Sequence, residues 1–268
     1  MASLADPRAE PRLEQLRERL HAVTDPELDE SVLSLGFVSS LSVDDRDHVA
    51  IGFRLPTYWC SANFAWIMAE DMRDAVRALP WVKGVSVSLD DHMFAAEING
   101  AMAADRSFRD AFGAEADGSS LEAVRRTFER KAFGRRQLAL AEALLADGWV
   151  ASRLTSLRVR ELSALAAHAE AVRHYLAKRA VPGPFGPDDP ALVDEHNRTV
   201  APERLAVHLS GLRGVVVNME FNGALCRGLL AARYDEQDTV APLAPRAPEL
   251  IDFIRAAPRP SGGTTCKR

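Results

Sequence analysis

The hydrophobic periodicity of the chain changes near Asn99-Gly100, and this change restricts the possible folds more than any other feature. Before it, patterns that repeat every two residues alternate with patterns that repeat every three to four residues. The first kind is typical of half-buried strands and the second of helices. After it, residues 103–180 carry almost only the helical repeat. We therefore expect an α+β fold: a small helix-and-sheet domain at 10–100, a mostly α-helical region at 101–255, and a disordered tail at 256–268.

The first hundred residues predict the order helix, strand, strand, helix, strand. Pro26 disfavours helical geometry in the residue before it and so ends the first helix. Residues 44–47 form a polar turn between two alternating runs, which indicates an antiparallel hairpin. The predicted segments are a helix from 12 to about 24, strands over 37–43 and 49–55, a helix over 61–79, a strand over 85–89, and one more short strand at Glu97-Ile98.

The rest of the chain predicts helices interrupted by one irregular loop. A third helical segment of this region is expected at 156–179, before the breaker cluster Pro182–Pro187. Shorter helices are expected near 202–212 and 222–233. The apolar run at 214–219 between them has the composition of a buried strand.

Composition argues against nucleic acid as a partner. Hydrophobic residues make up 47% and charged residues 26%, the balance of a soluble globular protein. The net charge is −5, so the chain as a whole does not attract phosphate backbones. Two basic pairs, Arg125-Arg126 and Arg135-Arg136, lie in helical patterns, and we expect them on solvated helix faces.

The three cysteines indicate free thiols. Cys60, Cys226 and Cys266 are widely spaced and form no CxxC motif, which argues against a disulfide framework and a zinc ribbon. Free thiols suit a reducing compartment. No apolar run approaches the roughly 18 residues that a membrane span requires. We therefore expect a cytoplasmic protein with no membrane partner.

Cys60 lies between the end of a predicted strand and the start of a predicted helix. The positive end of a helix dipole favours a thiolate there, as a soft metal ligand or a nucleophile. Burial as a small core residue explains the position equally well. Asp25 and Glu27 flank a rigid proline and are candidate hard ligands, although Asp25 is also a good turn cap.

A second group of candidate residues follows the apolar run at 214–219. Glu220, Asn222 and Cys226 are expected to contribute to one site, with or without Cys60. The alternative is a buried turn whose polar groups bind backbone. The chain carries none of the common catalytic or nucleotide-binding motifs and no paired Glu-x-x-His motif of a di-iron bundle.

The order of motifs over residues 10–98 resembles the metal–sulfur cluster assembly family, which includes SufT, PaaD and cytosolic iron–sulfur targeting factors. Asp-Pro-Glu-Leu is followed by Leu-Gly-Phe-Val, a hairpin, a Thr-x-x-Cys loop, a helix and Trp-Val-x-x-Val-x-Val. The matching residues are Asp25, Pro26, Glu27, Leu35, Gly36, Val38, Thr57, Cys60, Val82, Val85 and Val87. This sequence departs from the family at Tyr58, Trp59 and Ser61, where small residues and a proline are usual.

The resemblance implies a maturation factor and not an enzyme. The family's reactive cysteine corresponds to Cys60, and its acidic motif to Asp25 and Glu27. Iron or an iron–sulfur cluster would bind transiently, with Glu220 and Cys226 as further candidate ligands and Thr57, Tyr58, Trp59 and Asn222 shaping the site. The helical region is similar to that of members associated with soluble di-iron monooxygenases, which implies a client metalloenzyme subunit.

Three functions remain open from the sequence. The first is an accessory factor for iron–sulfur cluster or iron-centre assembly, in which the helical region docks the client or forms a homodimer. The second is a metal-independent scaffold or chaperone for a hydroxylase subunit. The third is a thiol enzyme with Cys60 as nucleophile, which would need a nearby base such as His92.

Overall fold

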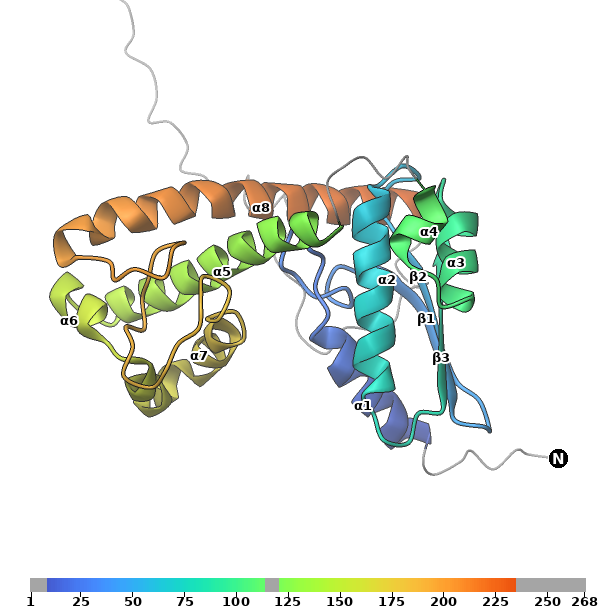
Figure 1. The fold of residues 1–268 in the computed structure, drawn as a ribbon, viewed down its shortest axis with the longest axis horizontal. Helices are drawn as coiled ribbons and strands as arrows, with labels where there is room; N and C mark the ends of the chain where they lie inside the picture. Colours follow the sequence, from blue (N-terminus) through green and yellow to red (C-terminus); the bar gives the residue numbers. More distant parts are fainter. Residues whose placement is uncertain (1–8, 114–120, 235–268) are drawn as a thin grey trace, which may run out of the picture.

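The computed structural model describes residues 9–113 and 121–234. The predicted tail at 256–268 and the end of the predicted helical region, 235–255, lie outside these ranges. Figure 1 shows a small helix-and-sheet unit and a helical unit, with one long helix running along both. The fold class is α+β, as the periodicity predicts.

The elements of the first unit follow the predicted order. Periodic apolar residues form the helices, and alternating ones form the strands. The predicted hairpin and the second helix are confirmed to within a few residues. The elements are α1 (Ala9–His21), β1 (Val38–Val43), β2 (His48–Arg54), α2 (Ala62–Arg77) and β3 (Gly84–Asp90).

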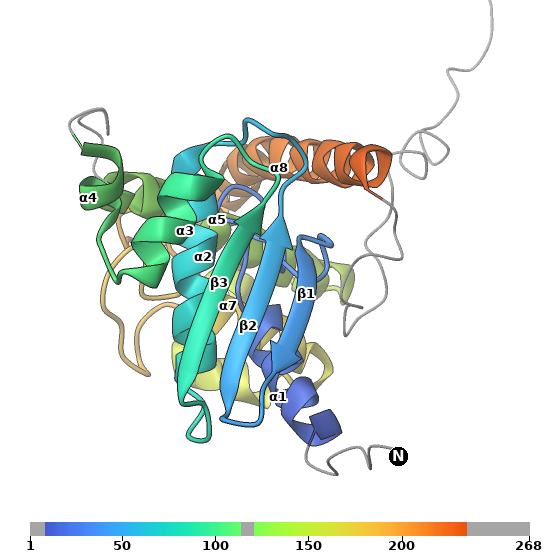
Figure 2. The ribbon, with the colours of Figure 1, turned by 90° about the vertical axis from the view of Figure 1, so that its right-hand side faces the viewer.

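The three strands form one sheet in the order β1-β2-β3. β1 pairs antiparallel with β2, and β2 pairs parallel with β3 through a crossover that contains α2. A register shift between Val38 and Ser40 marks a bulge in β1. Figure 2 shows α2 behind the sheet. On β3, Val87 and Leu89 are buried while Ser86 and Ser88 are exposed, so one face of this strand carries the apolar side chains.

The remaining described elements are helical. Helices α5 and α8 are long and pack along each other, and α6 and α7 lie on the other side of α5 in the second unit, whereas α3 and α4 lie beside β3 in the first unit (Figure 1). The elements are α3 (Ala95–Ala103), α4 (Phe108–Phe112), α5 (Leu121–Ala146), α6 (Ala151–Ser156), α7 (Ala169–Leu176), α8 (Leu205–Arg233) and three short 3-10 segments at Val159–Ala164, Ala166–His168 and Pro202–Arg204.

Three predicted segments were wrong. Glu97-Ile98 lies in α3, where Ile98 is buried. The predicted strand at 214–219 is the middle of α8, because a short apolar run does not distinguish a helix from a strand; only Val216 and Met219 of this run are buried. The single helix predicted over 156–179 is divided into 3-10 segments followed by α7. The two short helices predicted near 202–212 and 222–233 are one continuous helix, apart from a 3-10 turn at its start.

The buried side chains form two apolar cores, and α8 contributes to both. The first core includes the sheet, α1 and α2, and it also takes Leu230 from the end of α8. The second includes α5, α7 and the beginning of α8, with Leu209 and Val216 among its members. The helix therefore joins the two units through apolar packing. Within the described residues, no helix combines the length and apolar character needed to cross a membrane.

The packing of Leu230 generates a testable prediction. Leu230→Ala removes a buried side chain from the first core and is expected to lower the free energy of unfolding by about 2–4 kcal/mol. Val150→Ala, at an exposed position outside α8, is the matched control and is expected to change it by less than about 1 kcal/mol. Urea unfolding of both variants measures the difference. Equal effects would mean that the end of α8 does not stabilise the first unit.

Candidate functional site

Cys60 lies in the loop between β2 and α2, directly before the N-cap residue Ser61. Its side chain is partly buried against the first core. The Thr57 hydroxyl lies 3.0 Å from the Cys60 sulfur. A hydroxyl at this distance can donate a hydrogen bond to a thiolate, and the helix N-terminus favours the same charge. The predicted position of Cys60 between a strand and a helix is confirmed.

His92 holds the backbone of this loop. Its Nε2 lies 2.9 Å from the Cys60 carbonyl oxygen, and its Nδ1 accepts a hydrogen bond of 3.2 Å from the Phe94 N–H. Since Nδ1 accepts, Nε2 carries the proton and donates to the carbonyl. Burial lowers the pKa of His92, which favours this neutral form. The imidazole is thus engaged by backbone groups on both nitrogens and does not contact the Cys60 thiol as a base.

The acidic motif forms a tight turn after α1. The Asp25 carboxylate accepts hydrogen bonds of 2.9 Å from the backbone N–H groups of Glu27 and Leu28. The capping role is therefore present in the structure. Asp25 is buried, and burial raises its pKa to about 7, against two backbone hydrogen bonds that lower it. A carboxyl group with this pKa exchanges its proton near neutral pH.

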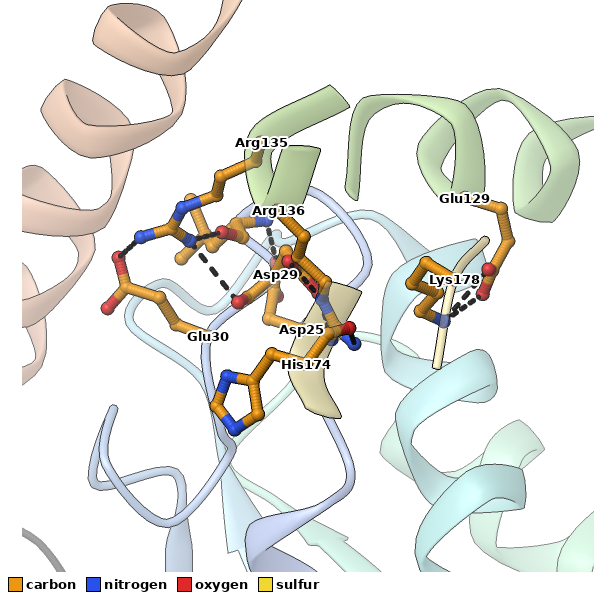
Figure 3. Close-up of polar contacts among 9 residues, drawn as sticks. Asp25, Asp29, Glu30, Glu129, Arg135, Arg136, His174 and Lys178 are labelled. Carbon is orange, nitrogen blue, oxygen red and sulfur yellow. Dashed lines mark hydrogen bonds and ion pairs between the residues drawn. The ribbon is translucent and has the colours of Figure 1, made fainter. Parts of the chain in front are cut away.

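Three arginines of the helical unit bind the end of this turn, residues 28–30, and Figure 3 shows two of them, Arg135 and Arg136. Arg135 of α5 donates to the Leu28 carbonyl oxygen and approaches Glu30 at 3.5 Å. Arg136 of α5 donates to both carboxylate oxygens of Asp29, at 2.9 and 2.6 Å. Arg227 of α8 pairs with Glu30. We call Arg135, Arg136 and Arg227 the arginine clamp.

The clamp corrects one prediction from the sequence. The side chains of Arg135 and Arg136 are only 23% and 16% exposed, so this pair does not lie on a solvated face. Arg125 also reaches the first unit, where it pairs with Glu70 and Asp71 of α2. Arg126 alone matches the expectation, since it stays 65% exposed. The sequence does contain a cluster of arginines in one helix and a cluster of acidic residues about 100 positions earlier. Helical periodicity alone does not show that these two clusters form ion pairs with each other.

Helix α8 brings two further predicted residues to the turn and the loop. Asn222 donates a hydrogen bond of 3.4 Å to Glu27. Cys226 is one turn further along the helix and packs, like Cys60, against the first core. Burial, with a smaller contribution from negative charge on Asp25, Cys60 and Glu27, raises the pKa of Cys226 to about 12. The two cysteines and two carboxyl groups thus lie within electrostatic reach of one another.

Close approach of α8 depends on Gly223. A Cβ atom at this position would lie 2.9 Å from a carboxylate oxygen of Glu30 and 3.4 Å from the Arg227 guanidinium. A larger residue would press on this ion pair. Gly223 lies between Asn222 and Cys226, in the part of α8 that faces the acidic motif. Its lack of a side chain therefore lets Asn222 and Cys226 lie close to that motif.

Glu220 lies apart from the other predicted residues. It is two residues before Asn222 on a continuous helix, and two residues subtend about 200° around the axis. Glu220 and Asn222 therefore leave the helix in nearly opposite directions. The alternative of a buried turn in this segment is wrong, because α8 continues without interruption to Arg233.

The loop that carries Cys60 exposes large apolar side chains. Trp59 is 72% exposed and Tyr58 is 49% exposed, and Met93 of the neighbouring loop is exposed as well. The Met93 N–H donates to the Tyr58 carbonyl oxygen at 2.9 Å, which joins the two loops. Arg233 at the end of α8 donates to the Leu55 and Asp91 carbonyl oxygens and so fixes both loops to the helix. Exposed aromatic residues beside a thiol are suited to contact a protein partner.

The arrangement provides donors for a soft cation, but not a closed site. Within 9–113 and 121–234, no three His, Cys, Asp or Glu side chains are grouped so as to hold a metal ion. Asp25, Glu27 and Cys60 each already share a hydrogen bond with the protein. A metal bound here would need a side-chain movement or ligands from elsewhere, which suits exchange better than permanent storage.

Comparison with known proteins supports the N-terminal resemblance. Residues 13–89 match the family described as iron–sulfur cluster assembly protein. An uncharacterised protein of Methanocaldococcus jannaschii is 29% identical over 86 residues, which cover 32% of this chain and 88% of that protein. The first unit is therefore similar to iron–sulfur cluster assembly proteins, and this match supports a general role in that process.

The buried carboxyl group of Asp25 predicts a pH dependence of stability. Its pKa is near 7 in the folded protein and about 3.9 in an unfolded chain. The folded state then binds the proton more tightly, so this stabilising contribution is complete below about pH 4 and is lost as the pH rises through about 7. Wild type should lose stability across this window relative to Asp25→Asn, by at most about 1.4 kcal/mol per pH unit.

Urea unfolding of both proteins at several pH values measures this effect. Asparagine keeps the side-chain oxygen that accepts the two backbone hydrogen bonds, so the turn is retained in the variant. Parallel stability curves for wild type and Asp25→Asn would show that Asp25 has an ordinary pKa.

The arginine clamp predicts a large cost for Arg136→Ala. Asp29 has a side chain that is only 4% exposed, and this substitution leaves its carboxylate without its charged partner. We expect the free energy of unfolding to fall by about 3 kcal/mol. Arg126→Ala, which removes an exposed pair with Glu122 on the same helix, should cost less than about 0.5 kcal/mol. A small effect of Arg136→Ala in thermal unfolding would contradict a structural role for the clamp.

Proposed function

We propose that the protein is a cytoplasmic accessory factor that receives iron or an iron–sulfur cluster at Cys60 and passes it to a client metalloenzyme. The observation that carries the proposal is that Cys60 and Cys226, from different units, pack against the same core, and that Cys226 lies within electrostatic reach of Cys60, Asp25 and Glu27. The match of residues 13–89 to iron–sulfur cluster assembly proteins supports the nature of the cargo.

In this proposal Cys60 is the first ligand. Its sulfur is partly exposed, lies before a helix N-terminus, and has the Thr57 hydroxyl as a hydrogen-bond donor. Cys226 supplies a second thiolate after its proton leaves. Asp25 and Glu27 supply carboxylate oxygens or accept the released protons. Glu220 is not included, since it points away from this group.

Release is as important as binding for a carrier. A complete set of four ligands from one chain would hold the metal too tightly for transfer. Asp25, Glu27 and Cys60 already share hydrogen bonds with the protein, so they would complete only part of a metal's coordination and leave positions for ligands of the client. We propose a SufT- or PaaD-like carrier whose client is a carboxylate-bridged di-iron monooxygenase subunit.

A metal-independent scaffold is the second candidate function. The exposed side chains of Tyr58, Trp59 and Met93 favour it, because they form an apolar surface beside the loop without taking part in any ligand set. Both functions use this surface to contact the client. They differ in whether the Cys60 thiol is needed.

Anaerobic reconstitution with ferrous iron and sulfide separates the two functions. We expect wild type to bind iron with visible absorption, Cys60→Ala to lose at least about tenfold in bound iron, and Cys226→Ala to lose less. Cys266→Ala, which changes the cysteine near the C-terminus, is the matched control and should bind as wild type does. Iron retained by Cys60→Ala, or absent from wild type with an intact fold, would favour the scaffold.

A further inference from the structure

The outward face of α8 has a chemistry that the rest of the described structure does not explain. Six large apolar side chains of this helix are exposed, each by 40–61%. Within Leu205–Arg233, Arg213 is the only exposed residue with a charge, and it pairs with Glu142. An uncharged apolar surface along a helix roughly 43 Å long is typical of an interface. The six residues are Val207, Val215, Val217, Phe221, Leu225 and Leu229.

Three glycines on this helix have no packing role within the described chain. A Cβ atom at Gly211, Gly214 or Gly228 would meet nothing within 4 Å. Each glycine costs a helix interior roughly 0.5–1 kcal/mol relative to alanine. Gly134 and Gly223, in contrast, lie against Leu212 and Glu30. The open glycines allow a second helix to approach the α8 backbone closely.

Large and small residues are unevenly distributed along this face. The second half carries the larger Phe221, Leu225 and Leu229, and the first half carries the smaller Val207, Val215 and Val217 together with Ser210 and Gly214. A parallel copy of α8 in the same register would place large residues against large ones. An antiparallel copy places large against small, which gives better interlocking.

In an antiparallel pair of helices, choosing one pair of opposite residues fixes all the others. With Asn218 of one copy opposite Phe221 of the other, Gly214 lies opposite Leu225 and Ser210 opposite Leu229. The same register places Gly211 opposite Gly228. Each pair occurs twice, as two-fold symmetry requires. Large side chains of one copy therefore lie opposite small residues of the other copy, and no charges on this face would repel each other.

We propose that the outward face of α8 is the interface of a homodimer, formed by two antiparallel copies of this helix. The second copy covers the exposed apolar side chains and fills the spaces above the open glycines. The dimer leaves the inward face of α8, with Asn222 and Cys226, against the acidic turn. The proposal does not depend on metal binding, so it stands or fails independently of the proposed function.

Analytical ultracentrifugation of the full chain over a wide concentration range tests the dimer. We expect wild type to dimerise and Phe221→Glu or Leu225→Glu to raise the dissociation constant by about a hundredfold or more, because each buries a charge at the interface. Val150→Glu is the matched control, since Val150 is 62% exposed but lies outside α8. A monomeric wild type at all concentrations, or an unchanged dimer of both α8 variants, would overturn the proposal.

Cross-linking tests the direction of the two helices. In the antiparallel register, cysteines introduced by Asn218→Cys lie near the two-fold axis, so a short bis-maleimide should join them. Those introduced by Ser210→Cys lie roughly 28 Å apart along the helices and should not be joined. Mass spectrometry of the cross-linked peptides distinguishes these products from native cysteines. Equal cross-linking at both positions would overturn the antiparallel arrangement.

Discussion

The structure depends on the ion pairs that the arginine clamp forms with Asp29 and Glu30. These carboxylates belong to the turn that follows the first helix, and their partners lie more than 100 residues later in α5 and α8. The groups are mostly buried, so neither side can lose its partner without leaving a desolvated charge. The clamp therefore fixes the conformation of the acidic turn and the position of the helical unit together.

This coupling makes the candidate site a product of both units. Gly223 permits α8 to approach the turn, and the approach brings Asn222 to Glu27 and Cys226 near Cys60. The segment matched by the assembly family, 13–89, ends well before these residues. The helical unit thus adds a thiol and an amide to a site that the first unit would otherwise form alone. The helical unit therefore changes both the side chains of the candidate site and the surface that a partner can contact.

The sequence predicted local structure better than it predicted contacts between distant segments. The alternation over 49–55 defines β2, and motif order places Cys60 before α2, because both depend on neighbouring residues. The run at 214–219 was mistaken for a strand because three consecutive valines suggest a buried segment, whereas only Val216 packs against the second core and Val215 and Val217 are exposed on α8. Arg136 was expected to face solvent because helical periodicity does not reveal Asp29, 107 residues away, as its partner. Similarly, no spacing rule predicts that Cys226 packs against the same core as Cys60.

Burial controls the protonation state of two side chains of the candidate site. Asp25 has a pKa near 7 and Cys226 one near 12, so at neutral pH the Cys226 thiol is neutral and the Asp25 carboxyl group is partly protonated. This limits electrostatic repulsion between these two groups and the neighbouring Cys60 and Glu27 side chains. In the proposed carrier, a metal ion bound by these groups would have to displace their protons, so its binding would be linked to proton release. Protons and metal would compete for the same ligands, and the affinity for the metal would therefore fall as the pH is lowered.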